Sequence, residues 1–267
     1  MSALTAKLKS SIREHLARRG RGQSFLELAL ILPILLIMLV GMVEIVVFIG
    51  RYLDVLDLTR EAARFASQRD PQIPELVVGA SPGDMDCSTA GAFNFFYDTA
   101  CIFSPPIGSA ACWDPDYCNG LNPYMIMNPA TDDVIVTVFT ISGISGLPAV
   151  EQTWPNDIPV AAGGDGKYWA LSNHDSDLVH NDNWMLNCQG EVTRSEPHYT
   201  EARITPELIA AAPDSKGYVA VEFFYCYNQI LNLPLFTEFV PNPIQIHAYT
   251  IMPLPSARPT PTPSPSP

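Results

Sequence analysis

A run of 25 residues from Phe25 to Ile49 constrains this chain more than any other feature, because only Glu27 and Glu44 in it are not apolar. A hydrocarbon core of about 30 Å needs about 20 helical residues, so the run can cross a bilayer with some tilt. A secretory signal is the alternative, but the apolar region of a signal is only about 7–15 residues long and is followed by a small-residue cleavage site. The run in this chain is longer, and no such site follows it closely. The run therefore predicts a single membrane-spanning helix.

Positive charge is concentrated on one side of this run. Only Arg51 and Arg60 follow soon after it. Six basic residues precede it: Lys7, Lys9, Arg13, Arg18, Arg19 and Arg21. An excess of Lys and Arg marks the cytoplasmic flank, so we predict that the amino terminus lies inside the cell. The whole chain has a net charge of −13, so the part beyond the run is strongly acidic. This argues against nucleic acid as a partner, whereas the basic leader suits an anionic lipid surface.

The helix is predicted to continue beyond the membrane. Five uncharged residues after the run recur at helical spacing: Tyr52, Leu56, Thr59, Ala63 and Ala66. We expect one helix from about Gln23 to about Gln68, ended by Asp70 and Pro71. At about 1.5 Å per residue it measures roughly 70 Å, so its outer part protrudes from the bilayer.

The two carboxylates in the apolar run need an explanation, because a charge at the centre of a membrane helix costs about 2.5–3.5 kcal/mol. Glu44 lies near the outer end of the run, where its side chain can reach the interface, and it is otherwise a candidate intramembrane assembly residue like Glu27. Glu27 lies near the inner end, five residues after Gly22. A cut after Gly22 would create an α-amine on Gln23, which could pair with Glu27 of a neighbouring subunit.

At these residues the chain resembles a known family. The matching features are Gly22-Gln23-Ser24-Phe25-Leu26-Glu27, Pro33, Gly41, Glu44, Tyr52 and Ala62-Ala63-Arg64-Phe65-Ala66. Together they resemble the TadE-like pseudopilins of the tight-adherence (Flp pilus) machinery, whose general plan is similar to that of type IV pilins. The resemblance covers residues 20–68.

The resemblance implies a minor pseudopilin, a structural or assembly component of a pilus or secretion system in the cytoplasmic (inner) membrane. It implies prepilin-peptidase cleavage between Gly22 and Gln23, with Glu27 as the assembly carboxylate and Pro33 loosening the helix for extraction. The implied partners are other pilin or pseudopilin subunits, Tad assembly proteins and the peptidase. An aromatic residue often follows the glutamate in this family, but Leu28 stands here, which leaves cleavage open.

All six cysteines follow the apolar run, on the predicted outer side: Cys87, Cys101, Cys112, Cys118, Cys188 and Cys226. An even number in an oxidising compartment predicts disulfides, although sequence does not distinguish the 15 possible pairings. We favour pairs between successive cysteines, in the order of this list. A zinc site is disfavoured because no Cys-x-x-Cys occurs.

Three segments have the composition and alternation of strands, namely Asp133–Ile141, Gly217–Tyr227 and Pro243–Met252. A short helix is expected over Thr205–Ala212, with Pro206 in its first turn. The fold class is therefore α+β: a long transmembrane helix extends outward and packs on a small antiparallel sheet with long, disulfide-pinned loops. We divide the chain into a basic cytoplasmic leader (1–22), a transmembrane and protruding helix (23–69), an extracytoplasmic domain (70–252) and a disordered, proline-rich tail (253–267).

No catalytic or cofactor motif is present. The polar stretch from His174 to Asp182 lacks the spacing of a calcium loop, so a solvated loop is favoured over a metal site. Four tryptophans could line a sugar-binding surface, but core packing is the more common role: Trp113, Trp154, Trp169 and Trp184. We expect no enzyme, no metal and no cofactor. The alternative functions are a permanently anchored protein that displays a binding domain and, with less support, a membrane-tethered hydrolase.

Overall fold

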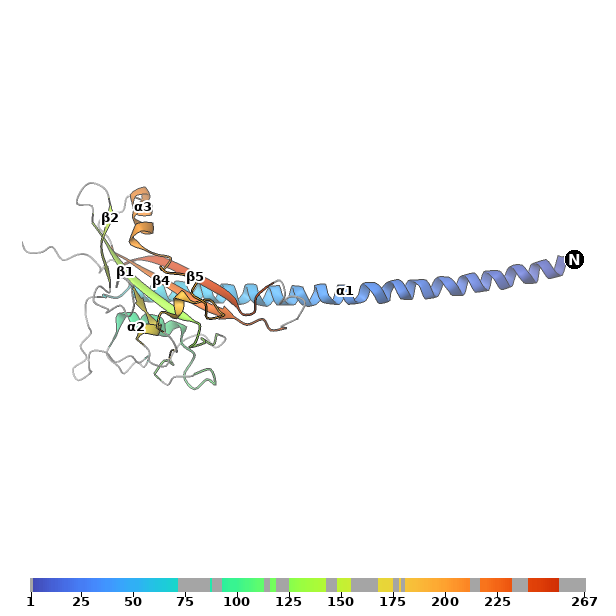
Figure 1. Ribbon diagram of the computed structural model, residues 1–267, viewed down its shortest axis with the longest axis horizontal. Coiled ribbons are helices and arrows are strands. Elements are labelled where there is room, and N and C mark those ends of the chain that lie inside the picture. The colour runs from blue at the N-terminus through green and yellow to red at the C-terminus, as the bar shows by residue number, and fades with distance from the viewer. Residues whose placement is uncertain are drawn as a thin grey trace, which may run out of the picture.

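The computed structural model describes residues 2–71, 87, 93–112, 116–118, 125–142, 148–154, 168–174, 178, 181–211, 217–231 and 240–254. Side chains are described from residue 25 onward, apart from residues 142, 149, 151, 152, 154, 210 and 211. The architecture is α+β, as predicted: one very long helix carries a small antiparallel sheet on its C-terminal part (Figure 1).

The long helix, α1, runs without interruption from Ser2 to Ser67. At about 1.5 Å per residue its 66 residues measure roughly 100 Å. The prediction that it begins near Gln23 was wrong, because the leader is rich in Ala, Leu, Lys and Arg, which are strong helix formers. The predicted C-terminal end is confirmed to within a few residues. There the Arg69 guanidinium donates to the carbonyl of Phe65 at 2.9 Å and lies over the Phe65 ring.

The sheet has the order β2-β1-β4-β5, with β3 also paired to β1, and all its pairs are antiparallel. The strands are β1 (Asp133–Ser142), β2 (Ala149–Trp154), β3 (Trp169–Ala170), β4 (Gly217–Tyr227) and β5 (Ile244–Leu254). The three predicted strands are confirmed as β1, β4 and β5. Sequence reasoning missed β2 and β3, which are short and pair only with β1, so neither shows a long alternating pattern.

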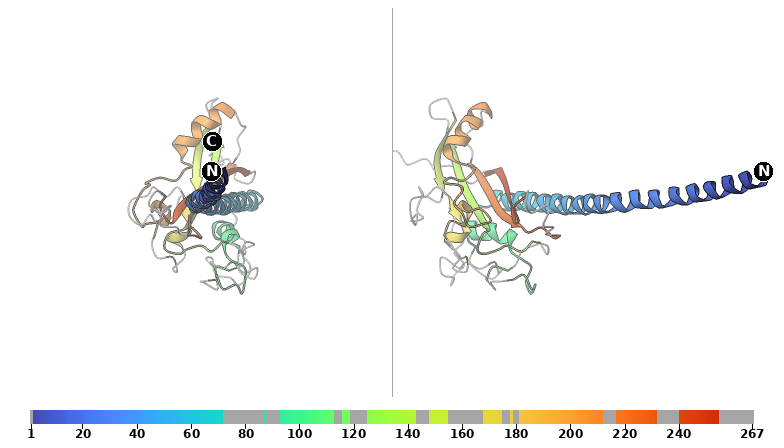
Figure 2. Two further views of the ribbon diagram at one scale, coloured as in Figure 1. Left: turned by 90° about the vertical axis from the view of Figure 1, so that its right-hand side faces the viewer. Right: turned by 45° about the vertical axis from the view of Figure 1, so that its right-hand side comes forward.

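Both faces of the central strands are covered, so β4 reads as a nearly continuous apolar run. On one face, Val219, Val221, Phe223, Tyr225 and Tyr227 pack in the main core with α1. On the other face, Ala220 packs with Ile204 and Leu208 of a second helix, and Phe224 packs with Trp184. Figure 2 shows the sheet between α1 and this second helix, α3.

Helix α3 spans Glu201–Ala211 and therefore begins four residues before the predicted helix. Pro206 lies inside it rather than in its first turn. The start is set by tertiary contacts, because the residues just before the helix donate backbone N–H groups to Glu222 of β4. The helix covers the end of the sheet remote from the N-terminus of α1 (Figure 1).

A short helix, α2 (Phe95–Ala100), was not predicted. Asn94 caps it: its Oδ1 atom accepts the N–H groups of Phe96 and Tyr97, and its own N–H donates to Asp98. An Asn followed four residues later by an Asp was the available signal. A 3₁₀ turn, Cys101–Phe103, follows directly. Disulfides join Cys87–Cys101, Cys112–Cys118 and Cys188–Cys226, the favoured pairs.

Candidate assembly and docking site on the anchor helix

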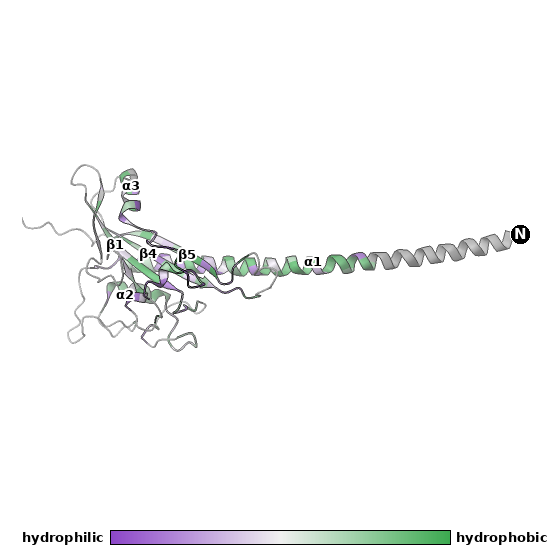
Figure 3. Cartoon of the chain, in the orientation of Figure 1, coloured by the Kyte–Doolittle hydropathy of each residue, from purple (hydrophilic) through white to green (hydrophobic). Residues whose placement is uncertain are grey.

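Helix α1 has two parts that differ in what surrounds them. From Phe25 to Leu39 every side chain is exposed, and nearly all of them are apolar. From Val40 onward, the residues facing the folded domain are partly or fully buried. Figure 3 shows the apolar part of α1 projecting from the domain. Within Phe25–Ser67 this helix is long and apolar enough to cross a membrane, which supports single-pass membrane anchoring.

The buried face of α1 is built from small residues where it crosses the sheet. Ala62, Ala63 and Ala66 are fully buried, and so is Thr59, whose hydroxyl donates to the carbonyl of Val55 at 2.7 Å. Small side chains let the helix axis approach β4 and β5 closely. The outward face carries ion pairs between residues three apart instead, such as Asp57 with Arg60. Tyr52 lies nearer the membrane-spanning run and is 41% exposed.

Glu44 joins the anchor to the end of the domain that lies nearest the uncovered part of α1. Its Oε1 atom accepts the Tyr227 hydroxyl at 2.9 Å and the Ile230 N–H at 3.0 Å. Its Oε2 atom accepts the Leu231 N–H at 3.0 Å. Both oxygens are thus used to hold the segment that follows β4 against α1. These contacts lie within the chain, so whether Glu44 also acts in assembly stays a prediction.

Tyr227 and Phe48 surround this contact with apolar surface. Their rings lie edge to face with centroids 5.6 Å apart. Burial, followed by the hydrogen bond to the Glu44 carboxylate, raises the pKa of Tyr227 to about 12. The hydroxyl therefore remains protonated and donates at any physiological pH. We call the set of Glu44, Tyr227, Ile230 and Leu231 the Glu44 clamp.

The other predicted assembly residues lie outside this clamp. Glu27 and Pro33 are on the exposed apolar part of α1, 17 and 11 residues before Glu44. Pro33 does not break the helix, and Figures 1 and 2 show α1 without a sharp bend. Gly22 and Gln23 have helical backbone within α1. The structure therefore separates an uncovered part that carries Glu27 from a docked part that begins near Glu44.

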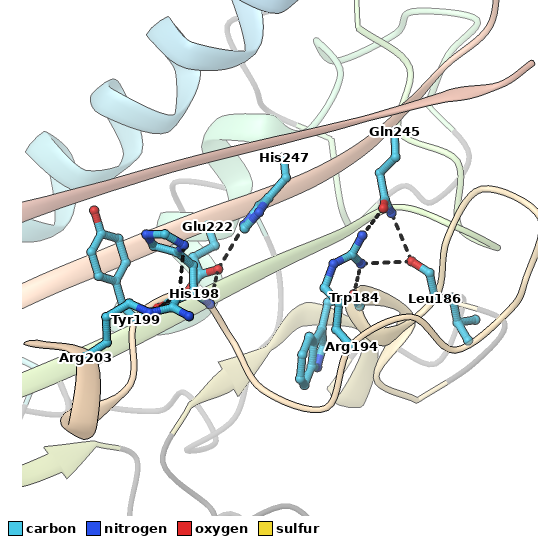
Figure 4. A network of polar contacts seen from close by, with 9 residues as sticks. All are labelled: Trp184, Leu186, Arg194, His198, Tyr199, Arg203, Glu222, Gln245 and His247. Atoms are coloured by element: carbon cyan, nitrogen blue, oxygen red, sulfur yellow. Dashed lines mark hydrogen bonds and ion pairs between the residues drawn. The ribbon is translucent and has the colours of Figure 1, made fainter. Parts of the chain in front are cut away.

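A second polar cluster lies on the opposite face of the sheet, around the buried carboxylate of Glu222 (Figure 4). This carboxylate accepts the backbone N–H groups of His198 and Tyr199, each at 2.9 Å, and His247 Nε2 lies 3.0 Å from it. Arg203 donates to the His198 carbonyl at 2.6 Å. Burial is the main cause that lowers the pKa of His198. The contacts of His198, Tyr199 and Arg203 orient the start of α3, and the His247 contact joins β5 to β4.

Arg194 forms the other network in Figure 4. Its guanidinium donates to the carbonyls of Trp184 and Leu186 and to the Gln245 side chain. It also lies 4.8 Å from the centre of the Phe224 ring. The arginine thus fastens the segment around Trp184 to β4 and β5.

Two adjacent carboxylates at the start of β1 are fully buried. Asp133 accepts four hydrogen bonds, from the Val134, Ser172 and Trp184 N–H groups and the Ser172 hydroxyl. Asp132 accepts the N–H groups of Asn128 and Cys226. Burial raises the pKa of each to about 7, although the hydrogen bonds act in the opposite direction. Sequence reasoning did not single out these residues, and an acid pair directly before an apolar strand was the only signal.

Part of the stretch from His174 to Asp182 is described, and the described residues are held by internal contacts. His174 contacts the Ala170 carbonyl at 2.9 Å through Nδ1, and its ring stacks on Trp169. Asp182 accepts hydrogen bonds from Asn173, Tyr168 and the Trp184 indole. Residues 175–177, 179 and 180 lie outside the described residues. Among those that the structure describes, no three His, Cys, Asp or Glu residues are grouped to hold a metal ion.

Two of the four tryptophans can be placed. Trp169 and Trp184 are buried, at 3% and 0% exposure, which confirms the core role for these two. Trp113 and the side chain of Trp154 lie outside the described residues. For the described pair, a sugar-binding surface is excluded by their burial.

Fold and site together define a membrane-anchored α+β protein whose anchor helix also forms part of the core of its folded domain. Residues 22–64 match the family model described as TadE-like protein, which confirms the resemblance found over residues 20–68. The match is confined to that segment and indicates a membrane component related to the Tad pilus. No curated protein matches the chain. No solved structure matches it either.

Proposed function

We propose that this protein is a minor pseudopilin of a tight-adherence pilus or secretion system, anchored in the inner membrane with its amino terminus in the cytoplasm. The observation that carries the proposal is the position of the TadE-like match, residues 22–64. It covers the uncovered apolar part of α1 and the adjoining part that docks on the sheet. A pseudopilin needs both, since the first part packs among neighbouring helices and the second carries the domain.

Glu27 is the residue proposed to act in assembly. Its side chain is exposed in a stretch where nearly all other side chains are apolar, so a charged partner from another subunit would be strongly favoured there. The α-amine of Gln23 in a neighbouring subunit, created by a prepilin peptidase, has the required charge. Pro33, six residues after Glu27, lacks an N–H group and so weakens the helix at that point. A weakened helix suits extraction from lipid. Other pilins and Tad assembly proteins are the proposed partners.

We propose further that the protein has no catalytic activity. The buried acids Asp132, Asp133 and Glu222 each accept several internal hydrogen bonds, which accounts for them as structural groups. Any role in the pilus system would then be carried by binding and assembly.

The test is the amino-terminal sequence and mass of the protein isolated from its native membrane, together with a Glu27→Ala variant. A chain that starts at Gln23 is the expected result for the wild type. The variant should be found in the membrane but not in sheared filaments. A Glu27→Gln variant separates loss of charge from loss of side-chain volume, and it should fail in the same way.

The opposite outcome supports a different function. A wild-type chain that keeps Met1 or Ser2 and is absent from filaments would indicate a permanently anchored protein that displays a binding domain. Glu27 would then be dispensable, and both variants would behave as wild type.

A further inference from the structure

We infer that the segments flanking the β4–β5 connection form a second membrane contact, which rests in the outer lipid interface beside α1. The residues involved are Ile230, Leu231 and Val240. The inference rests on the membrane anchoring that underlies the proposed function. It adds that the domain is seated directly on the bilayer rather than held away from it on a stalk.

The first argument is the level at which the Glu44 clamp lies. A hydrocarbon core of about 30 Å corresponds to about 20 helical residues. Counted from Phe25, the first apolar residue after the basic leader, these end at about Glu44. The Ile230 and Leu231 N–H groups are hydrogen-bonded to the Glu44 carboxylate, so both residues lie at the outer boundary of the core. Helical side chains also tilt toward the helix N-terminus, which here is the membrane side.

The second argument is exposure. Ile230 is 62% exposed, and Leu231 and Val240 are 38% and 39% exposed. On the uncovered face of α1 at the same level, Met42, Ile45, Val46 and Ile49 are between 49% and 68% exposed. The helix and the connection thus present apolar side chains together around the clamp. This surface continues the apolar part of α1 without a break, and lipid is the partner that already surrounds that part.

The third argument is charge. The chain has a net charge of −13, yet the described residues on both sides of the connection, 228–231 and 240–246, include no Asp, Glu, Lys or Arg. A charged side chain at this depth would carry a desolvation cost. Among the residues that the structure describes at this level, Glu44 is the carboxylate, and it accepts three hydrogen bonds, which offset that cost. Tyr227 adds an aromatic ring with a polar end, a residue type favoured at the interface.

The experiment measures depth in the bilayer with an environment-sensitive fluorophore. One unpaired cysteine is added to the full chain in each of two variants, Ile230→Cys and Val240→Cys. The added cysteine is labelled with a nitrobenzoxadiazole dye, and the protein is reconstituted in phosphatidylcholine vesicles. Leu36→Cys, in the uncovered part of α1, is the control expected to lie in the hydrocarbon core. Ile209→Cys on α3, where Ile209 is 45% exposed, is the control remote from the membrane. Vesicles contain lipids with nitroxides at a shallow or a deep position.

The labels at 230 and 240 are expected to have blue-shifted emission and to be quenched most by the shallow nitroxide, several-fold more than the label at 209. The label at 36 should be quenched most by the deep nitroxide. If 230 and 240 behave like 209 while 36 remains in lipid, the inference fails and the anchor stands. If 36 is also exposed to water, the anchoring itself fails. Blue-shifted labels at 230 and 240 that no nitroxide quenches would show that protein, not lipid, covers this surface, which overturns the inference.

Discussion

The Glu44 clamp allows a quantitative test of how the anchor holds the domain. Replacement Glu44→Ala removes three hydrogen bonds, from the Tyr227 hydroxyl and the Ile230 and Leu231 N–H groups. Each is taken at about 0.7 kcal/mol, below the range of about 1.5–3 kcal/mol that is usual for a bond to a charged group, because Ile230 and Leu231 lie at the surface of the domain. The clamp then contributes about 2 kcal/mol, so the local opening equilibrium should increase roughly 30-fold in the variant.

Amide hydrogen exchange of the full chain in lipid nanodiscs measures this opening directly. The protection of the Ile230 and Leu231 amides should fall by that factor, while the amides of β1 and β4 keep their protection. Glu44→Gln retains one acceptor oxygen and loses the bond to Leu231, so it should reduce protection only about threefold. Asp57→Ala is the matched control on the same helix, because the Asp57 side chain is 79% exposed.

Two results would refute the reasoning. Unchanged protection in Glu44→Ala would mean that packing of Phe48 and Tyr227, not the carboxylate, holds the segment after β4. Equal losses in the alanine and glutamine variants would mean that the charge, rather than the number of hydrogen bonds, determines the strength of the clamp.

Three further predictions concern the folded domain, and each is measured as stability of the full chain in detergent. Because burial raises the pKa of Asp132 and Asp133 to about 7, above the usual Asp value, the folded state binds more protons than the unfolded chain between about pH 4 and 7. Their contribution to stability should therefore fall as pH rises through that window, and the fall should be smaller in Asp133→Asn; a steeper fall would contradict this. Ala63→Leu should overpack the fully buried contact of α1 with the sheet and cost about 1–3 kcal/mol in denaturant titration, whereas no loss would mean that α1 is loosely docked. Replacing Cys188 and Cys226 by alanine opens a loop of 38 residues and should lower the free energy of unfolding by about 4 kcal/mol. An unchanged denaturation midpoint would show that the unfolded chain is already restrained there without the disulfide.

Elements with a strong local pattern were predictable from sequence. Strands β1, β4 and β5 alternate or are rich in β-branched and aromatic residues over about ten positions, and each was located to within two residues. The short strands β2 and β3 and helix α2 lack such length. Their formation depends on pairing with β1 or on the cap at Asn94, and a local pattern of two to six residues is too weak to identify them.

The candidate site divides in the same way. Glu27, Pro33 and Glu44 were recognised because charge and proline are rare in an apolar helix. Glu222 and the Asp132–Asp133 pair were missed, since their hydrogen-bond donors come from segments that are distant in sequence: Asp132 accepts the Cys226 N–H 94 residues away. An acid inside the apolar pattern of β4 was a visible signal for Glu222, but nothing local indicated which groups would satisfy it.

The sequence by itself determined that the chain has one apolar helix, that this helix is long enough to cross a bilayer, and that an acidic, disulfide-bearing α+β domain follows it. These properties depend on length, apolarity and periodicity, which are local. Only the tertiary structure decided how the domain sits on that helix, because the Glu44 carboxylate has its partner Ile230 186 residues further along the chain. A buried or half-buried charge is stabilised by the donors that folding brings to it, and the identity of those donors is a property of the fold.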